Sequence, residues 1–312
     1  MVYGHNFPAI EPYIYSFHVP LFFLISGIFH PKKVDYQLVK KRFKMIMLPY
    51  FVWASLLFLF WLFLGRRFGD SEFTAGSVTD NIIGIFYAQG GGQYMEWGIP
   101  LWFLPCIFVL FLCYSGINTI QKKWQRITAI IIAATLGFIW PVLTGMHLPW
   151  SIDVALVATA FYGTGHLMSD GIKNINRKQA LMMLPIFLAI GILAFYFNPD
   201  KVDMYRSQYG NQLLFLASGI GGSLAVMLFF RIVPVFRFLS YIGRHTIVIL
   251  ATHLRAMTLI KAIMVFVFGI VLTEFTELEK FGWSIAQIII VIPVIWIVNK
   301  YAPILDGKIK KP

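Results

Sequence analysis

Two histidines near the start of the chain have side chains that could move a proton. His5 lies in a short polar stretch, and His18 lies near the start of an apolar segment at residues 15–29. Histidine has an ordinary pKa of about 6.5, so near neutral pH it can take a proton from a hydroxyl group and return it. Ser26, beside Gly27, adds a small polar notch further along the segment. We interpret His5 as a candidate catalytic base, and His18 and Ser26 as candidate substrate contacts.

Both histidines also have simpler interpretations. His5 could be an exposed terminal side chain, and His18 could lie in the interfacial region of a membrane. Pro20 follows His18, and a proline in the first turn of a helix loses no hydrogen bond, because that N–H would have no partner there. We therefore expect Pro20 to lie in the first turn of a helix.

Two further polar residues interrupt an apolar run at 246–269, namely His253 and Arg255. An ionised side chain at the centre of a membrane costs at least about 2.5–3.5 kcal/mol, so it should face a polar cavity or a partner. Both residues are therefore candidate substrate-binding residues. The alternative is a structural ion pair or hydrogen bond.

Two more groups could bind parts of a reactant. Lys41, Arg42 and Lys44 lie close together before an apolar run, and such a cluster can hold several phosphate oxygens of a cofactor. The same cluster could be an ordinary basic anchor beside a membrane helix. Trp102 could stack against a sugar ring or belong to the aromatic belt at the membrane surface.

The cysteines suggest neither a disulfide nor a metal site. Cys106 and Cys113 lie in one apolar run, with no histidine or acidic cluster at metal-ligand spacing nearby. We expect two buried, inert thiols and no metal.

The composition is typical of a polytopic membrane protein. Of the 312 residues, 58% are hydrophobic and only 13% are charged, which leaves too little polar surface for a soluble domain of this length. The formal net charge of +12 would raise the question of nucleic acid in a soluble protein. Here the basic residues are better explained as loops on the cytoplasmic side of a bilayer, so we expect no nucleic-acid partner.

Nine apolar runs are long enough to cross a membrane, which takes about 20 residues each. They cover residues 14–30, 46–65, 99–118, 127–145, 152–169, 180–197, 212–230, 246–269 and 283–303. The sequence therefore predicts an all-α bundle with about nine full transmembrane helices and the remnant of a tenth before them, in a single domain over residues 1–312.

The loops between these runs alternate in charge. Assigned alternately to two sides, they carry 19 lysines and arginines on one side and 5 on the other. The basic side is cytoplasmic by the positive-inside rule. The sequence thus predicts a multi-pass protein of the cell (inner or plasma) membrane with a cytoplasmic C-terminus, and it puts His5 and His18 at the outer face.

Several motifs together resemble the acyltransferase 3 family of membrane O-acyltransferases, and in particular its fucose 4-O-acetylase-like branch. The most specific is FHVPLFFLISG at residues 17–27. The others are GH at 4–5, KRFK at 41–44 with LPY at 48–50, LWFLP at 101–105, LSYIGR at 239–244, and His253 in a late helix.

The resemblance implies ten spans and an acyl group taken from cytosolic acyl-CoA, with acetyl-CoA the expected donor. The acceptor would be a hydroxyl of a cell-envelope polysaccharide or a lipid-linked sugar. His5 would be the general base or a transient acyl carrier, and Lys41, Arg42 and Lys44 would hold the coenzyme A phosphates. The family's first helix carries a basic residue about three turns before its histidine, and since this sequence begins too late for one, we expect an N-terminally truncated domain.

Two functions of other classes remain open at this stage. A transporter or flippase for a lipid-linked saccharide would suit Arg255 and His253 equally well, although we find no convincing pair of broken half-helices in the two halves of the chain. A structural or sensory membrane subunit would have neither activity.

Overall fold

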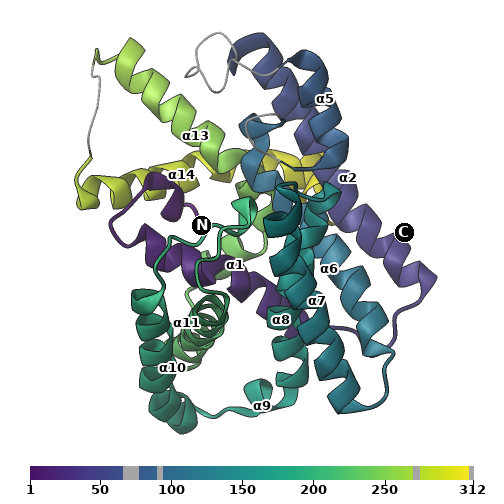
Figure 1. Cartoon of the computed structure of the whole chain (residues 1–312). Coiled ribbons are helices and arrows are strands. Elements are labelled where there is room, and N and C mark those ends of the chain that lie inside the picture. The colour runs from purple at the N-terminus through teal and green to yellow at the C-terminus, as the bar shows by residue number, and fades with distance from the viewer. Residues whose placement is uncertain (66–76, 90–93, 270–274, 309–312) are drawn as a thin grey trace.

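The protein is a bundle of α-helices in a computed structural model that describes residues 1–65, 77–89, 94–269 and 275–308 (Figure 1). Within these ranges there is no β-strand, only an isolated bridge between Asp203 and Gln208. The predicted all-α fold is therefore confirmed. Between the second and third predicted spans, residues 66–76 and 90–93 lie outside the described residues, and the described part includes a short helix, α5.

The described part of the chain is a succession of helices. In chain order they are η1 (Gly4–Asn6), α1 (Glu11–Ile28), α2 (Tyr36–Phe60), η2 (Trp61–Gly65), α5 (Val78–Tyr87), η3 (Glu96–Trp102), α6 (Phe103–Asn118), α7 (Lys123–Thr144), η4 (Pro149–Ser151), α8 (Ile152–Leu167), α9 (Ser169–Asn174), α10 (Arg177–Phe197), η5 (Met204–Arg206), α11 (Gln212–Ile232), α12 (Arg237–Gly243), α13 (Thr246–Phe266), α14 (Glu277–Tyr301) and η6 (Pro303–Asp306).

All nine predicted apolar runs lie in helices. Seven described helical segments are long and apolar enough to cross a membrane, so the predicted polytopic bundle is confirmed. The runs in α1 and α8 are not among the seven. Helix α8 has 16 residues, and at 1.5 Å per residue it spans about 24 Å, less than the roughly 30 Å of a bilayer core.

Helix α1 lies in the middle of the bundle, against α8 and α11 (Figure 1). Glycines allow its backbone to approach α8 closely. A Cβ atom on Gly27 of α1 would lie 2.0 Å from the carbonyl oxygen of Tyr162, and one on Gly165 of α8 would lie 2.1 Å from that of Leu24. Small residues at helix crossings are typical of membrane bundles, because they bring the backbones into contact.

Pro20 does not lie in the first turn of α1, where it was expected. Pro12 occupies the first turn, whereas Pro20 lies inside the helix, so the prediction for Pro20 is wrong. The helix begins at Glu11, before the apolar run predicted from residue 14, and it follows a left-handed residue, Phe7, with φ of 53°, at the end of η1. Since Pro20 has no N–H, the carbonyl of Ser16 loses its helical partner.

Side chains cap several of the helices that follow. Asp35 accepts a hydrogen bond from the backbone N–H of Leu38 at the start of α2. At the start of α14, Thr276 and Glu279 form a reciprocal capping box. Such caps satisfy N–H groups that have no partner within the helix.

The last described turn, η6, ties three helices together. The Trp53 indole N–H of α2 donates to the carbonyl of Leu305, 2.9 Å away. Asp306 lies 2.5 Å from the Nδ1 atom of His245, which immediately precedes α13, and it also pairs with Lys308 at 2.7 Å. Asn299 of α14 donates to the same carboxylate at 3.3 Å. These contacts anchor the first turn of α13.

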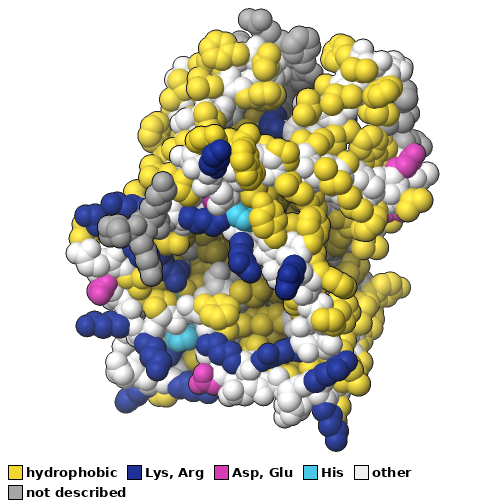
Figure 2. All heavy atoms as spheres, turned by 180° about the vertical axis from the view of Figure 1, so that it is seen from behind, with side chains coloured by type: hydrophobic (Ala, Val, Ile, Leu, Met, Phe, Trp, Pro, Cys, Tyr) yellow, Lys and Arg dark blue, Asp and Glu magenta, His cyan; other side chains and the backbone are white. Residues whose placement is uncertain are grey.

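The basic side chains gather in one part of the surface. Figure 2 shows lysines and arginines concentrated in its lower half and a mostly hydrophobic upper half. We call the end of the bundle that carries Lys41, Lys44 and the first turn of α13 the basic end. The loop between α10 and α11 lies at the opposite end, because α11 runs from that loop toward the connection that leads into α13.

We predict that adding one methyl group at the α1–α8 crossing destabilises the bundle. Gly27→Ala or Gly165→Ala forces the two backbones apart, which should cost roughly 1–3 kcal/mol. Both variants should lower the melting temperature of the detergent-solubilised protein by several degrees. Gly116→Ala in α6 is the matched control, because its Cβ would meet no atom within 4 Å. Equal melting temperatures for all three variants would contradict this packing.

Candidate active site

A cavity of about 350 Å³ lies beside the first half of α1. Its walls come from five parts of the chain: the N-terminal segment, α1, the η3–α6 junction, the α10–α11 loop and the first turns of α13. The lining side chains that carry a nitrogen or oxygen atom are His5, Glu11, Tyr15, His18, Trp102, Lys201, Asp203, Tyr205, Arg206 and Thr246.

The cavity is lined by segments that the chain order assigns to different ends of the bundle. Lys201 and Arg206 come from the α10–α11 loop, whereas Thr246 and Ile247 come from the first turn of α13 at the basic end. A reactant from each end could therefore reach the same space.

The N-terminal turn η1 lies between helices, partway along their length. Asn6 donates to the hydroxyl of Ser284 and accepts from the amide of Gln287, both at 2.8 Å. Gln287 is ten residues into α14, about 15 Å from its first residue. The sequence puts His5 at the outer face, but these contacts hold it midway along α14.

The His5 ring has a defined hydrogen-bonding direction. Its Nδ1 atom lies 3.0 Å from the carbonyl oxygen of Met1. A carbonyl oxygen only accepts, so Nδ1 carries the proton and Nε2 keeps its lone pair. Burial lowers the pKa of His5 below its ordinary value, so the ring is neutral near pH 7. A neutral ring with a free lone pair on the cavity wall has the properties of a general base.

His18 lines the same cavity and is fixed in the same way. Its Nδ1 atom donates to the carbonyl of Ile14 at 2.9 Å. The Tyr15 ring lies near both histidines, with centroid distances of 5.0 Å to His18 and 6.2 Å to His5. The structure thus brings His5 and His18 to one cavity, with an aromatic ring beside both.

An ion pair lies on the wall that faces the α10–α11 loop. The Lys201 ammonium donates to both oxygens of Glu11, at 2.9 and 3.0 Å, and lies 5.2 Å from the centre of the Tyr15 ring. Asp203 lies nearby, and burial raises the pKa of its carboxyl group. Sequence reasoning missed this pair, because it assigned the loop charges only to topology and the two residues are far apart in the chain.

Trp102, the candidate for sugar stacking, lines the cavity and lies 6.1 Å from the Tyr205 ring. Ser26 lies further along α1 and donates to the carbonyl of Phe22 at 2.8 Å. Arg255 donates to the carbonyl of Trp97 at 2.8 Å. Neither Ser26 nor Arg255 contributes to the cavity wall.

His253 is fully buried behind the cavity wall. Its Nε2 atom lies 3.3 Å from the Nδ1 atom of His5, and the two ring centroids are 4.9 Å apart. It therefore contacts the candidate base rather than the cavity itself.

The three predicted phosphate ligands, Lys41, Arg42 and Lys44, differ in exposure. Lys41 and Lys44 are exposed, whereas the Arg42 guanidinium packs over the Phe111 ring of α6 at 4.1 Å. An arginine stacked on an aromatic face contributes to packing as well as to charge. Two of the three predicted phosphate ligands are thus free to meet a solvent-borne anion.

Two more histidines pair with tyrosines near the basic end. His30 lies 2.9 Å from the Tyr162 hydroxyl, and His166 lies 2.9 Å from that of Tyr114. Neither histidine lines the cavity described above. These contacts link α1, α6 and α8.

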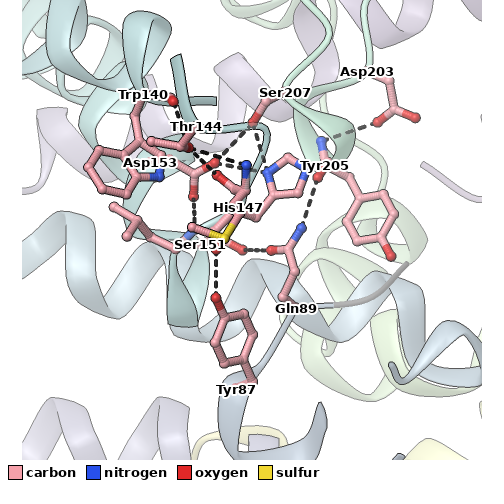
Figure 3. Close-up of polar contacts among 12 residues, drawn as sticks. Tyr87, Gln89, Trp140, Thr144, His147, Ser151, Asp153, Asp203, Tyr205 and Ser207 are labelled. Atoms are coloured by element: carbon pink, nitrogen blue, oxygen red, sulfur yellow. Dashed lines mark hydrogen bonds and ion pairs between the residues drawn. The ribbon is translucent and has the colours of Figure 1, made fainter. Parts of the chain in front are cut away.

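His147, Asp153 and Ser207 form a cluster of polar side chains between α8 and the α10–α11 loop (Figure 3). Asp153 is fully buried, its Oδ2 atom lies 3.0 Å from the Nδ1 atom of His147, and Ser207 donates to that oxygen at 3.1 Å. In a catalytic triad the acid and the nucleophile bind opposite nitrogens of the ring. Here both lie on the Nδ1 side, at 3.0 and 3.4 Å, so the cluster fastens the α10–α11 loop to α8.

Both cysteines are free, as predicted, but only Cys106 is buried; Cys113 is partly exposed, so the prediction of two buried thiols is wrong for Cys113. Across the described ranges, no group of three or more histidine, cysteine or acidic side chains is placed to hold a metal ion.

A family model described as "Acyltransferase domain", that of acyltransferase 3, matches residues 1–300. The chain belongs to the acyltransferase 3 family. It is therefore a multi-pass membrane acyltransferase, which confirms the family indicated by the sequence motifs. No curated protein and no solved structure matches the chain.

The cluster at Asp153 generates a prediction about this acyltransferase. Asp153→Ala leaves the Leu148 N–H and the Ser207 hydroxyl without this acceptor, and each hydrogen bond lost to the buried carboxylate should cost roughly 1–3 kcal/mol. The melting temperature should therefore fall. Asp170→Ala in the exposed helix α9 is the matched control and should leave it unchanged. Ser207→Ala should retain acyl transfer, and a loss as complete as that expected of a missing nucleophile would contradict the structural role.

Proposed function

We propose that this acyltransferase moves an acetyl group from cytosolic acetyl-CoA to a hydroxyl of a cell-envelope polysaccharide or a lipid-linked sugar. The observation that carries the proposal is a single cavity lined by His5, by residues of the α10–α11 loop and by the first turn of α13. A cytosolic donor and an acceptor on the other side need such a common space.

In the proposed reaction, His5 is the general base. Its Nε2 atom takes the proton of the acceptor hydroxyl as the oxygen attacks the thioester carbonyl. The new C–O bond forms, the C–S bond breaks, and His5 returns the proton to the departing sulfur. The products are the O-acetyl ester and free coenzyme A, so no further reactant is required.

The donor would bind from the basic end, which the charge distribution indicates is cytoplasmic. Lys41 and Lys44 would contact the phosphates, while Arg42 holds α2 against α6 through Phe111. On this assignment the C-terminal segment is also cytoplasmic, and the membrane is the cell's inner or plasma membrane.

The acceptor would bind at the opposite end of the cavity. Trp102 and Tyr15 offer aromatic faces for a sugar ring, and the Glu11 and Lys201 side chains offer charged hydrogen-bonding groups. His18 would orient the hydroxyl from α1. The alternative function, a flippase, was suggested by Arg255 inside an apolar run. The Arg255 guanidinium, however, donates a hydrogen bond to the Trp97 carbonyl and does not line the cavity.

We predict that His5→Gln abolishes acetyl transfer. General-base loss typically costs about 10²–10⁴-fold in rate. Membranes that contain the variant should transfer no radioactivity from labelled acetyl-CoA into glycan, while the protein inserts at normal levels. His166→Gln is the control, because its ring pairs with Tyr114 outside the cavity and its activity should persist. Full acetylation by His5→Gln would refute the assignment.

A second prediction concerns donor binding. Lys41→Ala together with Lys44→Ala should raise the KM for acetyl-CoA by several-fold, to about tenfold, and change kcat little, because exposed charges contribute about 0–1 kcal/mol each. The difference should shrink at high salt, which screens such charges. Lys122→Ala together with Lys123→Ala, in another basic loop, is the matched control. An unchanged KM in the Lys41 and Lys44 variant would exclude these two residues as phosphate ligands.

A further inference from the structure

The protonation state of His253 follows from its backbone contacts. Its Nδ1 atom lies 2.7 Å from the carbonyl oxygen of Ile249 and 3.2 Å from that of Leu250. Both partners are acceptors only, so Nδ1 carries the proton. A neutral imidazole has one N–H, and the Nε2 atom of His253 therefore presents a lone pair.

That lone pair faces the candidate base. The Nε2 atom of His253 is 3.3 Å from the Nδ1 atom of His5, which carries a proton because it also donates to Met1. The His5 N–H is thus shared between a carbonyl oxygen and an imidazole nitrogen. Since both acceptors lie on the Nδ1 side, the Nε2 atom of His5 is left to accept a proton.

We propose that His253 is a positioning residue that holds His5 in the Nδ1–H tautomer and accepts a hydrogen bond from the imidazolium formed when His5 takes the acceptor's proton. The proposal rests on the proposed role of His5 as the base. It moves His253 from the predicted substrate contacts to a residue that acts through His5.

The position of His253 in the bundle suits this role. It is the eighth residue of α13, about 10 Å from the first residue of that helix, and its side chain is fully buried. In such surroundings water does not stabilise a new positive charge, so a fixed acceptor beside the ring has a large effect. A neutral acceptor also avoids a permanent buried charge, which a carboxylate at this position would introduce.

Other titratable groups near His5 define what a pH experiment reads. The first cavity also contains Glu11, Tyr15, His18, Lys201, Asp203 and Arg206. A second cavity, on the other side of His5, contains Lys261 of α13 and Lys280 of α14. Among the described titratable side chains, His253 is the one within hydrogen-bonding distance of the His5 ring. A substitution at His253 therefore changes one side-chain contact of His5.

Substitutions at His253 separate the acceptor from the side-chain volume. His253→Gln keeps an acceptor, the amide oxygen, at a similar reach, whereas His253→Leu fills the space without one. We expect His253→Leu to lower kcat for acetyl transfer by roughly 10–100-fold with an unchanged KM for acetyl-CoA, and His253→Gln to restore most of it. An equal loss in both variants, at normal expression, would overturn the proposal.

A chemical probe tests the contact without relying on transfer activity. Diethyl pyrocarbonate modifies neutral imidazole, and mass spectrometry of the full chain in membranes reports the rate at His5. In the parent protein we expect a constant rate from pH 6 to pH 8, because the ring stays neutral. His253→Glu puts a carboxylate beside the ring, which favours the imidazolium, so the rate should fall below about pH 7.

The labelling experiment and the acetyl-transfer assay test the ring contact and the proposed function separately. An unchanged pH dependence at His5 in the His253→Glu variant would overturn the contact between the two rings, whether or not the protein transfers acetyl groups. If the His253→Glu variant shows the predicted pH dependence but the parent protein transfers no acetyl group, the contact is supported and the proposed function is refuted.

Discussion

The arrangement of the site depends on one buried set of hydrogen bonds, between Asn6 and the side chains of Ser284 and Gln287. A polar group inside a membrane must find its partner within the protein, since no water is available to replace it. The Asn6 amide satisfies this requirement only when η1 lies against the middle of α14. His5, its neighbour in the chain, is therefore held beside α13, where it meets His253. The short left-handed turn at Phe7 then returns the chain to the start of α1.

Close packing on two sides fixes the orientation of helix α1. On one side Gly27 and Gly165 bring its backbone against α8, and on the other side Gly222 of α11 leaves room for the Phe17 ring, since a Cβ there would lie 2.7 Å from it. With both neighbours so close, α1 cannot rotate without a clash. The side chains of Glu11, Tyr15 and His18 consequently face the same cavity as the residues of the α10–α11 loop.

The sequence allowed the helices to be predicted, because each is an apolar run bounded by charged or turn-forming residues. Its motifs also led to the correct family, and His5, His18 and Trp102 do line one cavity. The pairs that complete the site could not be predicted. Glu11 with Lys201, and His5 with His253, are contacts between distant segments, and hydropathy does not encode which faces of two helices meet. Arg42 illustrates the same limit, because a basic motif looks identical whether its side chain faces solvent or an aromatic ring.

The attachment of α13 has a geometric consequence. Its first turn is fixed through His245 and Asp306, whereas the residues at its far end, Phe266 and Val267, are largely exposed. A small tilt of the helix about the fixed end displaces each residue in proportion to its distance from that end. His253 lies about one third of the way along, so it moves about a third as far as Phe266. A displacement at the far end of α13 is therefore reduced to about a third at His253, which limits how much it changes the distance between the two imidazole rings.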